Sequence, residues 1–357
     1  MKKIVLFSLA MLALVSCSED GSNSNIAPIE TPSAGTVFGT AQHPLNVGGP
    51  NQQNQVYVDL SGEAALPVAR DSWDLGFYSG NDFRVVLNGS LMMAAKQLET
   101  TDITLPQEEN PAVAVGTFQQ ENLEYVDNPD GTLTGTAFKT IAASEAEAKV
   151  YLINLGHAVP TATPAVGSVN TAGDPRGWKK VKVWKDGDGY KLQYADLESA
   201  SFQEVAIAKS PGYNHTFFSF TTGIVMAEPE KDKWDMNFTT FTNEVFDNSG
   251  VSAGAYFYSD FIVINSKSGV TGFMVQGDSA AYGSFTAASV QAGNYQFSSD
   301  QRVIGANWRN VVPVQLYDNV FFVLKDGAGN MYKIKFISML NSNGERGFPV
   351  LQYQLLQ

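Results

Sequence analysis

Residues 70–77 read Arg-Asp-Ser-Trp-Asp-Leu-Gly-Phe, and residues 231–238 read Lys-Asp-Lys-Trp-Asp-Met-Asn-Phe, an offset of 161. The same offset relates residues 56–62, Val-Tyr-Val-Asp-Leu-Ser-Gly, to residues 217–223, Phe-Phe-Ser-Phe-Thr-Thr-Gly. Two matches in one register indicate an internal duplication. A period this long predicts two tandem modules rather than a propeller, whose blades repeat about every 40–45 residues.

A later pair of segments extends the duplication. Residues 185–194 resemble residues 325–336, each beginning Lys-Asp-Gly, but the offset here is 140, so the second copy is shorter. The Pro211-Gly212 pair interrupts the pattern between the copies. We therefore predict one module at residues 37–209 and a second at 210–357.

Most apolar segments are short, aromatic or β-branched, and bounded by turn residues, which predicts strands. The expected strands cover residues 56–60, 83–87, 217–220, 261–264, 320–324, 332–337 and 350–355. In residues 332–336 the period-two alternation predicts apolar side chains inward and lysines outward. Two short helices are expected, at 144–149 and 285–290. The predicted fold class is mostly β, with two tandem antiparallel β modules and little helix.

The N-terminus has the pattern of a bacterial secretion signal. Lys2 and Lys3 precede an apolar run at residues 4–15 that is too short to span a bilayer, and Ser16 precedes Cys17, the one cysteine. The pattern resembles a lipobox, so we predict a signal peptide at residues 1–16 and lipidation of Cys17. The alternative is ordinary cleavage beside an unused cysteine.

Residues 17–36 are rich in Ser, Asn, Pro and Gly and are expected to form a lipidated flexible tether. The acidic residues Glu19 and Asp20 follow Cys17 closely, which resembles the surface-export signal of lipoproteins of the Bacteroidetes. We therefore expect an outer-membrane lipoprotein exposed at the cell surface. The alternative is a polar tether without a sorting role.

Charge and motifs exclude several function classes. The formal net charge of −13 makes nucleic acid an unexpected partner, and a single cysteine cannot form an intrachain disulfide. Nucleophile elbows, zinc-protease motifs and phosphate loops do not occur in the sequence. Neighbouring acids such as Glu108 and Glu109, or Glu228 and Glu230, are expected to be solvated loop residues. We therefore predict a binding protein and not an enzyme.

Several motifs of the second module together resemble the HmuY family of haem-binding lipoproteins. They are Phe-Phe-Ser-Phe at 217–220, Trp-Asp-Met-Asn-Phe at 234–238, Asp-Phe-Ile-Val-Ile-Asn at 260–265, residues 320–327 and residues 349–353. The first module carries fainter forms at 73–77, 83–88 and 181–194. The resemblance implies an all-β fold, a haem or related tetrapyrrole between two axial histidine or methionine side chains, and delivery to an outer-membrane transporter.

The chain offers few residues for such ligation. Of its three histidines, His157 follows an apolar segment at roughly the place where the family's second ligand falls, although an ordinary loop histidine is the alternative. His43 is expected to be a solvated loop residue, and His215 is expected to be a polar residue at the start of a strand. Methionine is the other possible ligand, but each candidate also suits core packing. The methionine candidates are Met92, Met93 and Met274.

A second function class remains open. Without haem, the protein would be a surface glycan-binding or adhesin-type lipoprotein that presents aromatic side chains such as Trp308 and Tyr282. Trp73 and Trp234 are instead expected to anchor the core, with the neighbouring carboxylates of Asp74 and Asp235 bonded to nearby backbone.

Overall fold

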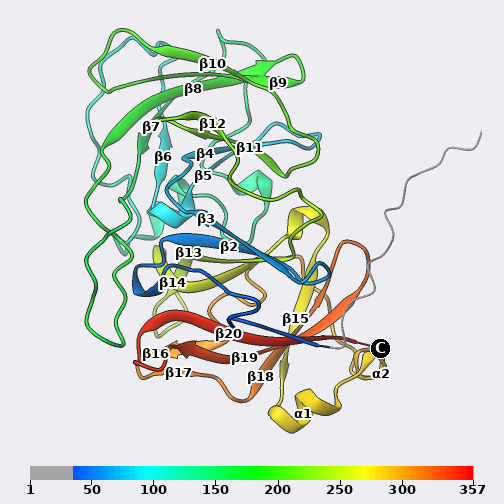
Figure 1. Cartoon of the computed structure of the whole chain (residues 1–357). Helices are drawn as coiled ribbons and strands as arrows, with labels where there is room; N and C mark the ends of the chain where they lie inside the picture. The colour runs from blue at the N-terminus through cyan, green and yellow to red at the C-terminus, as the bar shows by residue number, and fades with distance from the viewer. Residues whose placement is uncertain (1–34, 357) are drawn as a thin grey trace, which may run out of the picture. The chain divides into compact units, whose positions relative to one another are not determined.

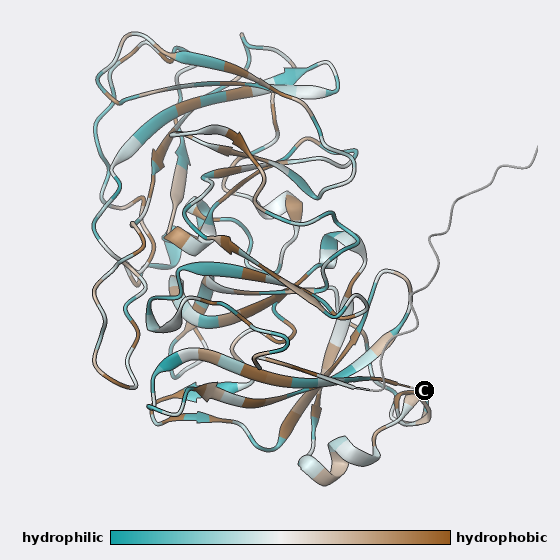
Figure 2. Ribbon diagram, in the orientation of Figure 1, coloured by the Kyte–Doolittle hydropathy of each residue, from teal (hydrophilic) through white to brown (hydrophobic). Residues whose placement is uncertain are grey.

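Each Trp-Asp stretch starts a β-strand, β4 (Leu75–Tyr78) in the first copy and β13 (Met236–Phe246) in the second. The computed structural model describes residues 35–356, which lie within one compact unit (Figure 1). All paired strands are antiparallel, which confirms the mostly β prediction. Figure 2 shows the hydrophobic residues concentrated along the strands, as expected for sheets that bury one face or both.

Two five-stranded sheets have the same design. The first has the order β1 (Thr36–Phe38), β20 (Arg346–Leu355), β19 (Met331–Leu340), β18 (Val320–Lys325) and β15 (Thr271–Gln276). The second has the order β10 (Gln203–Ile207), β9 (Gly189–Ala195), β8 (Trp178–Asp186), β7 (Val150–Asn154) and β6 (Ala94–Gln97).

Two four-stranded sheets contain the Trp-Asp strands. One has the order β14 (Ser252–Ile264), β13, β2 (Asn54–Asp59) and β3 (Ala64–Ala69). The other has the order β5 (Val85–Leu87), β4, β11 (His215–Ser219) and β12 (Gly223–Val225). A small hairpin joins β16 (Arg309–Val311) to β17 (Val314–Leu316).

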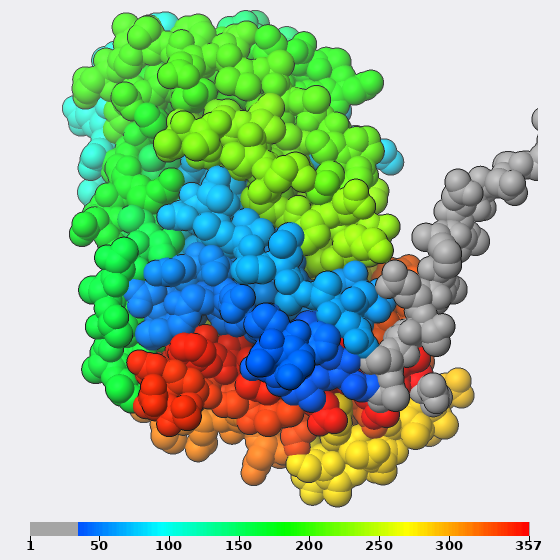
Figure 3. All heavy atoms as spheres, viewed as in Figure 1, coloured from blue at the N-terminus to red at the C-terminus, as the bar shows by residue number. Residues whose placement is uncertain are grey.

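The two copies exchange their first strands. β2 pairs with β13 of the second copy, and β11 pairs with β4 of the first, as Figure 1 shows. β1 likewise pairs with β20, while β10, which leads into β11, pairs with β9. In Figure 3 the blue N-terminal segment accordingly lies against the red C-terminal strands. The first strand of each copy thus pairs with a Trp-Asp strand of the other copy.

The hydrophobic cores follow this exchange. One core combines residues of segment 38–60 with residues from Met236 to Tyr353, and the other is built from residues between Leu75 and Phe218. Burial of apolar side chains is the main favourable term in folding, so each core depends on strands from both copies. The module boundary near residue 210 remains a prediction about sequence copies, because the cores do not follow it.

The sheet orders correct the second sequence match. β8 and β9 occupy the places that β19 and β20 hold in the other five-stranded sheet, not those of β18 and β19. Leu192-Gln193-Tyr194 of β9 therefore corresponds to Leu351-Gln352-Tyr353 of β20. The shared Lys-Asp-Gly turns misled the alignment, since any tight hairpin favours such residues.

Helix is sparse, as predicted. The α-helices are α1 (Ser279–Ser284) and α2 (Ala287–Ala292), close to the expected 285–290. Short 3-10 turns are η1 (Gly49–Asn51), η2 (Gly89–Leu91), η3 (Gln120–Tyr125), η4 (Leu133–Gly135) and η5 (Ser266–Ser268). The helix expected at 144–149 was wrong, because only a turn forms before β7 begins at Val150. Within the described part of the chain, none of the helices has the length and hydrophobicity needed to cross a membrane.

The alternation expected in β19 was wrong at Lys333. This residue is only 4% exposed, and its Nζ donates to the carbonyls of Tyr282 and Phe285 at 2.8 and 2.9 Å. The end of α1 covers this face of the strand and supplies acceptors to the ammonium group. Lys180 of β8 is buried similarly and donates to the Leu105 carbonyl at 2.7 Å.

Candidate functional site

His157 is held beside Met92 by a close backbone approach. Gly156 has a φ of +68°, and a Cβ there would lie 1.9 Å from the Leu91 carbonyl oxygen, so only glycine fits. The backbone N–H of His157 donates to the same carbonyl at 2.8 Å. The chain after β7 is therefore fixed against the end of η2, where Met92 follows.

The imidazole of His157 is oriented by a second contact. Its Nδ1 lies 2.8 Å from the carbonyl oxygen of Gly173, which can only accept a hydrogen bond. In the neutral ring, Nδ1 therefore carries the proton and Nε2 keeps its lone pair. Histidines that bind metals are commonly held in this way by a backbone carbonyl. His157 is half-buried, so the ring is neither part of a core nor freely solvated.

The three methionine candidates lie in different surroundings. Met92 has a φ of +64° and packs against a small cluster that includes Val115, Val126 and Ala255. Met93 is 1% exposed and belongs to the core formed by residues between Leu75 and Phe218. Met274 is 40% exposed on β15, in the other five-stranded sheet. The structure thus brings the backbone of Met92 close to that of Gly156 and His157, whereas Met93 fills core space.

The other residues singled out in the sequence make contacts within the fold. The His43 ring lies 5.5 Å from that of Phe38, in an edge-on contact. Asp74 and Asp235 bond to backbone, as expected, accepting from Phe220 N and Leu60 N at 2.8 Å. Cys17 lies outside the described residues, and its lipidation stays a prediction.

A cavity between the two Trp-Asp sheets was not foreseen from the sequence. It has two lobes of about 150 and 110 Å³, and Trp73, His215, Asn237 and Lys267 line both. A more open, polar vestibule of about 410 Å³ adjoins them, and Lys267 lines it too. The chain exchange builds this space, because its walls come from β2, β11 and β13. No pattern in the sequence predicts this cavity. The one hint is Lys267, a lysine that directly follows Asn265 and Ser266.

Ionisable groups that are buried or half-buried surround the cavity. Glu228 is 6% exposed, so the expectation of a solvated loop acid was wrong, and burial raises its pKa to about 7. Burial likewise raises the pKa of Asp127 to about 6, although Leu87 N and Ala137 N donate to its carboxylate. Burial lowers the pKa of His215 well below its usual value, so this imidazole is neutral at pH 7. Burial also lowers the pKa of Lys267.

Neither cavity lobe suits a tetrapyrrole. Pockets for drug-sized ligands measure roughly 300–1,000 Å³, well above the two lobes, and His157 lines neither of them. His157, by contrast, offers a nitrogen ligand of the kind that iron binds, because its other ring nitrogen, Nδ1, contacts the Gly173 carbonyl. Within residues 35–356 no group of three or more His, Cys, Asp or Glu side chains could hold a bare metal ion. A haem therefore does not fit the cavity lobes, and His157 offers a nitrogen ligand outside them.

The aromatic residues expected on a glycan-binding surface are buried. Trp308 is 1% exposed and stacks on Phe336 with ring centroids 4.5 Å apart, and Tyr282 is 7% exposed. This expectation was wrong because both rings pack against strands of the five-stranded sheet, Tyr282 on Phe321 of β18 and Trp308 on Phe336 of β19. Exposed rings occur elsewhere: Phe118 is 63% and Tyr256 39% exposed, with centroids 5.6 Å apart.

Comparison with known proteins agrees with the duplication. The sequence model of a protein family, described as "HmuY protein", matches residues 51–208 and again residues 212–353. No curated protein matches the chain. Among solved structures, the apo PinO crystal structure from Porphyromonas gingivitis has 15% identity and a TM-score of 0.15, covering 50% of this chain and 96% of that one. Because the two family matches together span most of the sequence, the chain belongs to the HmuY family, with two copies of the family's domain.

Proposed function

We propose that this protein is a surface-exposed lipoprotein that binds haem or a related tetrapyrrole through His157 and passes it to an outer-membrane transporter. Membership of the HmuY family supports haem as the ligand class. The observation that carries the proposal is the contact between His157 Nδ1 and the Gly173 carbonyl, which leaves Nε2 available for iron.

Met92 is the proposed second ligand. The close approach of Gly156 to the backbone of Leu91 and Met92 supports this choice, and a thioether is a known axial donor to haem iron. Met93 and Met274 are not part of this proposal, because the first is buried in a core and the second lies in the other sheet. Bound haem supplies the redox-active iron, and the protein supplies the ligands and their orientation.

A haemin titration tests the ligand and the site together. The mature chain without its lipid is titrated with haemin under oxidising and reducing conditions, and a saturable Soret shift is expected. His157→Ala should change the spectrum and weaken binding at least tenfold, whereas His43→Ala, the matched control, should change neither. Met92→Leu should alter the spectrum while Met274→Leu leaves it unchanged. A wild-type protein without a saturable shift in either redox state contradicts haem binding.

The location rests on the N-terminal sequence and needs its own experiment. Labelled fatty acid should be incorporated into the wild-type chain and not into Cys17→Ser. Protease added to intact cells should degrade the wild-type protein if it is exposed at the surface. Protection of the lipidated protein would place it on the inner side of the outer membrane instead.

One observation favours a glycan-binding function as the second candidate. Phe118 is 63% exposed despite a φ of +55°, a conformation that is costly for a bulky residue, and its ring lies beside that of Tyr256. Exposed aromatic rings of this kind bind the apolar faces of sugars. Retention on a polysaccharide array that is lost in Phe118→Ala, but kept in the control Phe246→Ala, would support it. Absence of retention on every polysaccharide would argue against it.

A further inference from the structure

The cavity between the two Trp-Asp sheets contains polar groups without protein partners. His215 Nε2, Trp234 Nε1 and Asn237 Oδ1 are fully buried and make no hydrogen bond within the described chain. All three residues line the lobe of about 110 Å³, and each is at least nine-tenths buried. Leaving a buried polar group unpaired is unfavourable, so three in one lobe indicate a space that is built for a polar occupant.

Lys267 stands where the three spaces meet. It lines both inner lobes and the vestibule, and its ammonium has no hydrogen bond or ion pair to another residue in the range 35–356. The carboxylates of Glu228 and Asp127 interact with it electrostatically without forming an ion pair. Lys267 is half-buried, and a cation partly withdrawn from water without a direct partner is unfavourable in a folded protein. An anionic group of a ligand would supply that partner.

The unpaired atoms also include acceptors. Asn237 Oδ1 can only accept, and Glu228 has lone pairs left after accepting from His215 N at 2.9 Å. The vestibule carries Asp130, whose negative charge favours the approach of a positive group, whereas Asp300 beside it is paired with Arg302. The cavity therefore combines donors for an anion with acceptors for a cation.

We propose that the cavity binds a small zwitterion of amino-acid size. Its carboxylate pairs with Lys267 and accepts from Trp234 Nε1, and its ammonium group donates to Asn237 and Glu228. The lobe that these residues line measures about 110 Å³. It is many times larger than the roughly 10–15 Å³ that one water needs, and smaller than the roughly 150 Å³ cavity that holds benzene, so only a small ligand fits. The ligand enters through the vestibule, past Lys267. The site does not include His157, so it is independent of haem binding.

Calorimetry and thermal unfolding of the mature protein test this with defined probes. Alanine should bind saturably and raise Tm with its concentration. Acetate and methylammonium, which each carry one of its two charges, should bind at least tenfold more weakly. Lys267→Met should lower the alanine affinity at least tenfold, whereas Lys139→Met, at an exposed lysine, should leave it unchanged.

The variants also report on folding. Without ligand, Lys267→Met should have a Tm equal to or above that of the wild type, because it removes an unpaired desolvated charge. Should it fail to fold, Asn237→Leu gives the same test from the acceptor side. The proposal is overturned if no probe of this size binds the wild type, which would mean that water alone fills the cavity. It is also overturned if acetate binds as tightly as alanine, or if alanine binds Lys267→Met equally well.

Discussion

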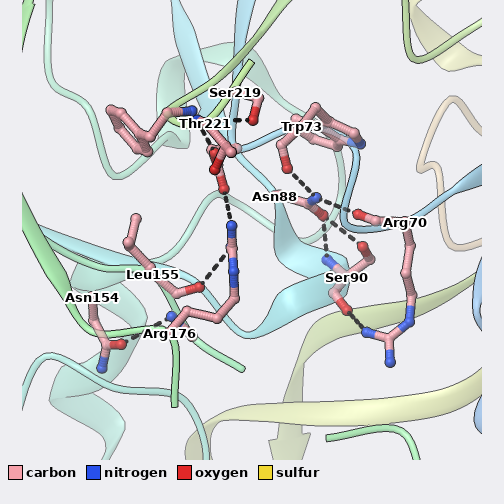
Figure 4. A network of polar contacts seen from close by, with 12 residues as sticks. Arg70, Trp73, Asn88, Ser90, Asn154, Leu155, Arg176, Ser219 and Thr221 are labelled. Atoms are coloured by element: carbon pink, nitrogen blue, oxygen red, sulfur yellow. Dashed lines mark hydrogen bonds and ion pairs between the residues drawn. The ribbon is translucent and has the colours of Figure 1, made fainter. Parts of the chain in front are cut away.

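Asp74 and Asp235 are equivalent residues in different electrostatic surroundings, which makes them a matched pair for substitution. Each carboxylate accepts a backbone N–H from an exchanged strand segment, Phe220 N and Leu60 N respectively, both at 2.8 Å. Asp74 also forms an ion pair with Arg176 at 2.7 Å, and this pair belongs to the polar network of Figure 4. Asp235 has no ion pair within the described chain, and burial raises its pKa to about 8.

Asparagine keeps an acceptor oxygen in both places and removes only the charge. At pH 7 Asp235 is mostly protonated, so Asp235→Asn should reduce the free energy of unfolding by less than about 1 kcal/mol. Asp74→Asn breaks a buried pair, which costs about 3–5 kcal/mol when both charges are desolvated. The Arg176 side chain is 19% exposed, so the lower end, about 3 kcal/mol, is expected.

Urea unfolding at pH 7, followed by tryptophan fluorescence and circular dichroism, measures both costs. Coincident transitions by the two probes would justify a two-state treatment. A difference of about 2 kcal/mol or more between the variants supports the reasoning. Equal losses, or a larger loss for Asp235→Asn, would refute it, because they would mean that the Arg176 pair contributes nothing or that Asp235 is charged in the folded protein.

Three further predictions concern pH, a glycine and a lysine. Burial raises the pKa of Asp235 to about 8 and of Glu228 to about 7, whereas both lie near 4 in unfolded chains, at about 3.9 and 4.3. The folded state therefore binds more protons between those values, and the free energy of unfolding, measured in urea, should fall as pH rises from about 4 to 8; a rise would contradict this. Gly156→Ala places a Cβ against the Leu91 carbonyl, so haemin binding should weaken and Tm should drop, and an unchanged Tm would show that the contact is not rigid. Lys333→Met leaves buried carbonyls without their donor, so it should lower the free energy of unfolding in urea by about 1–3 kcal/mol. A loss near zero would contradict this reasoning.

The sequence predicted the strands well and their partners poorly. The Trp-Asp stretches identified β4 and β13 because a buried strand needs apolar residues in a recognisable period. Their inward residues are alike, Leu75 and Phe77 in one and Met236 and Phe238 in the other. Either strand could pair with β2, so pattern alone cannot decide between exchanged and unexchanged copies.

Side-chain roles that depend on distant segments were equally hidden. Periodicity placed Lys333 on a face of β19 but carried no information about α1, which covers that face. Trp308 was a candidate for ligand binding because the residues next to it in sequence do not reveal that it stacks on Phe336. The cavity was missed for the same reason, since its walls come from segments as far apart as residues 55 and 301.

The exchange of first strands changes how the two copies can evolve. A substitution at Val56 or Val58 is selected for its fit to β13 of the second copy, and one at Phe217 for its fit to β4 of the first. Neither copy can drift alone, because each supplies strands to the other's sheet. Separating the copies near residue 210 would remove β2 from β13 and β11 from β4, so neither copy alone would keep both four-stranded sheets.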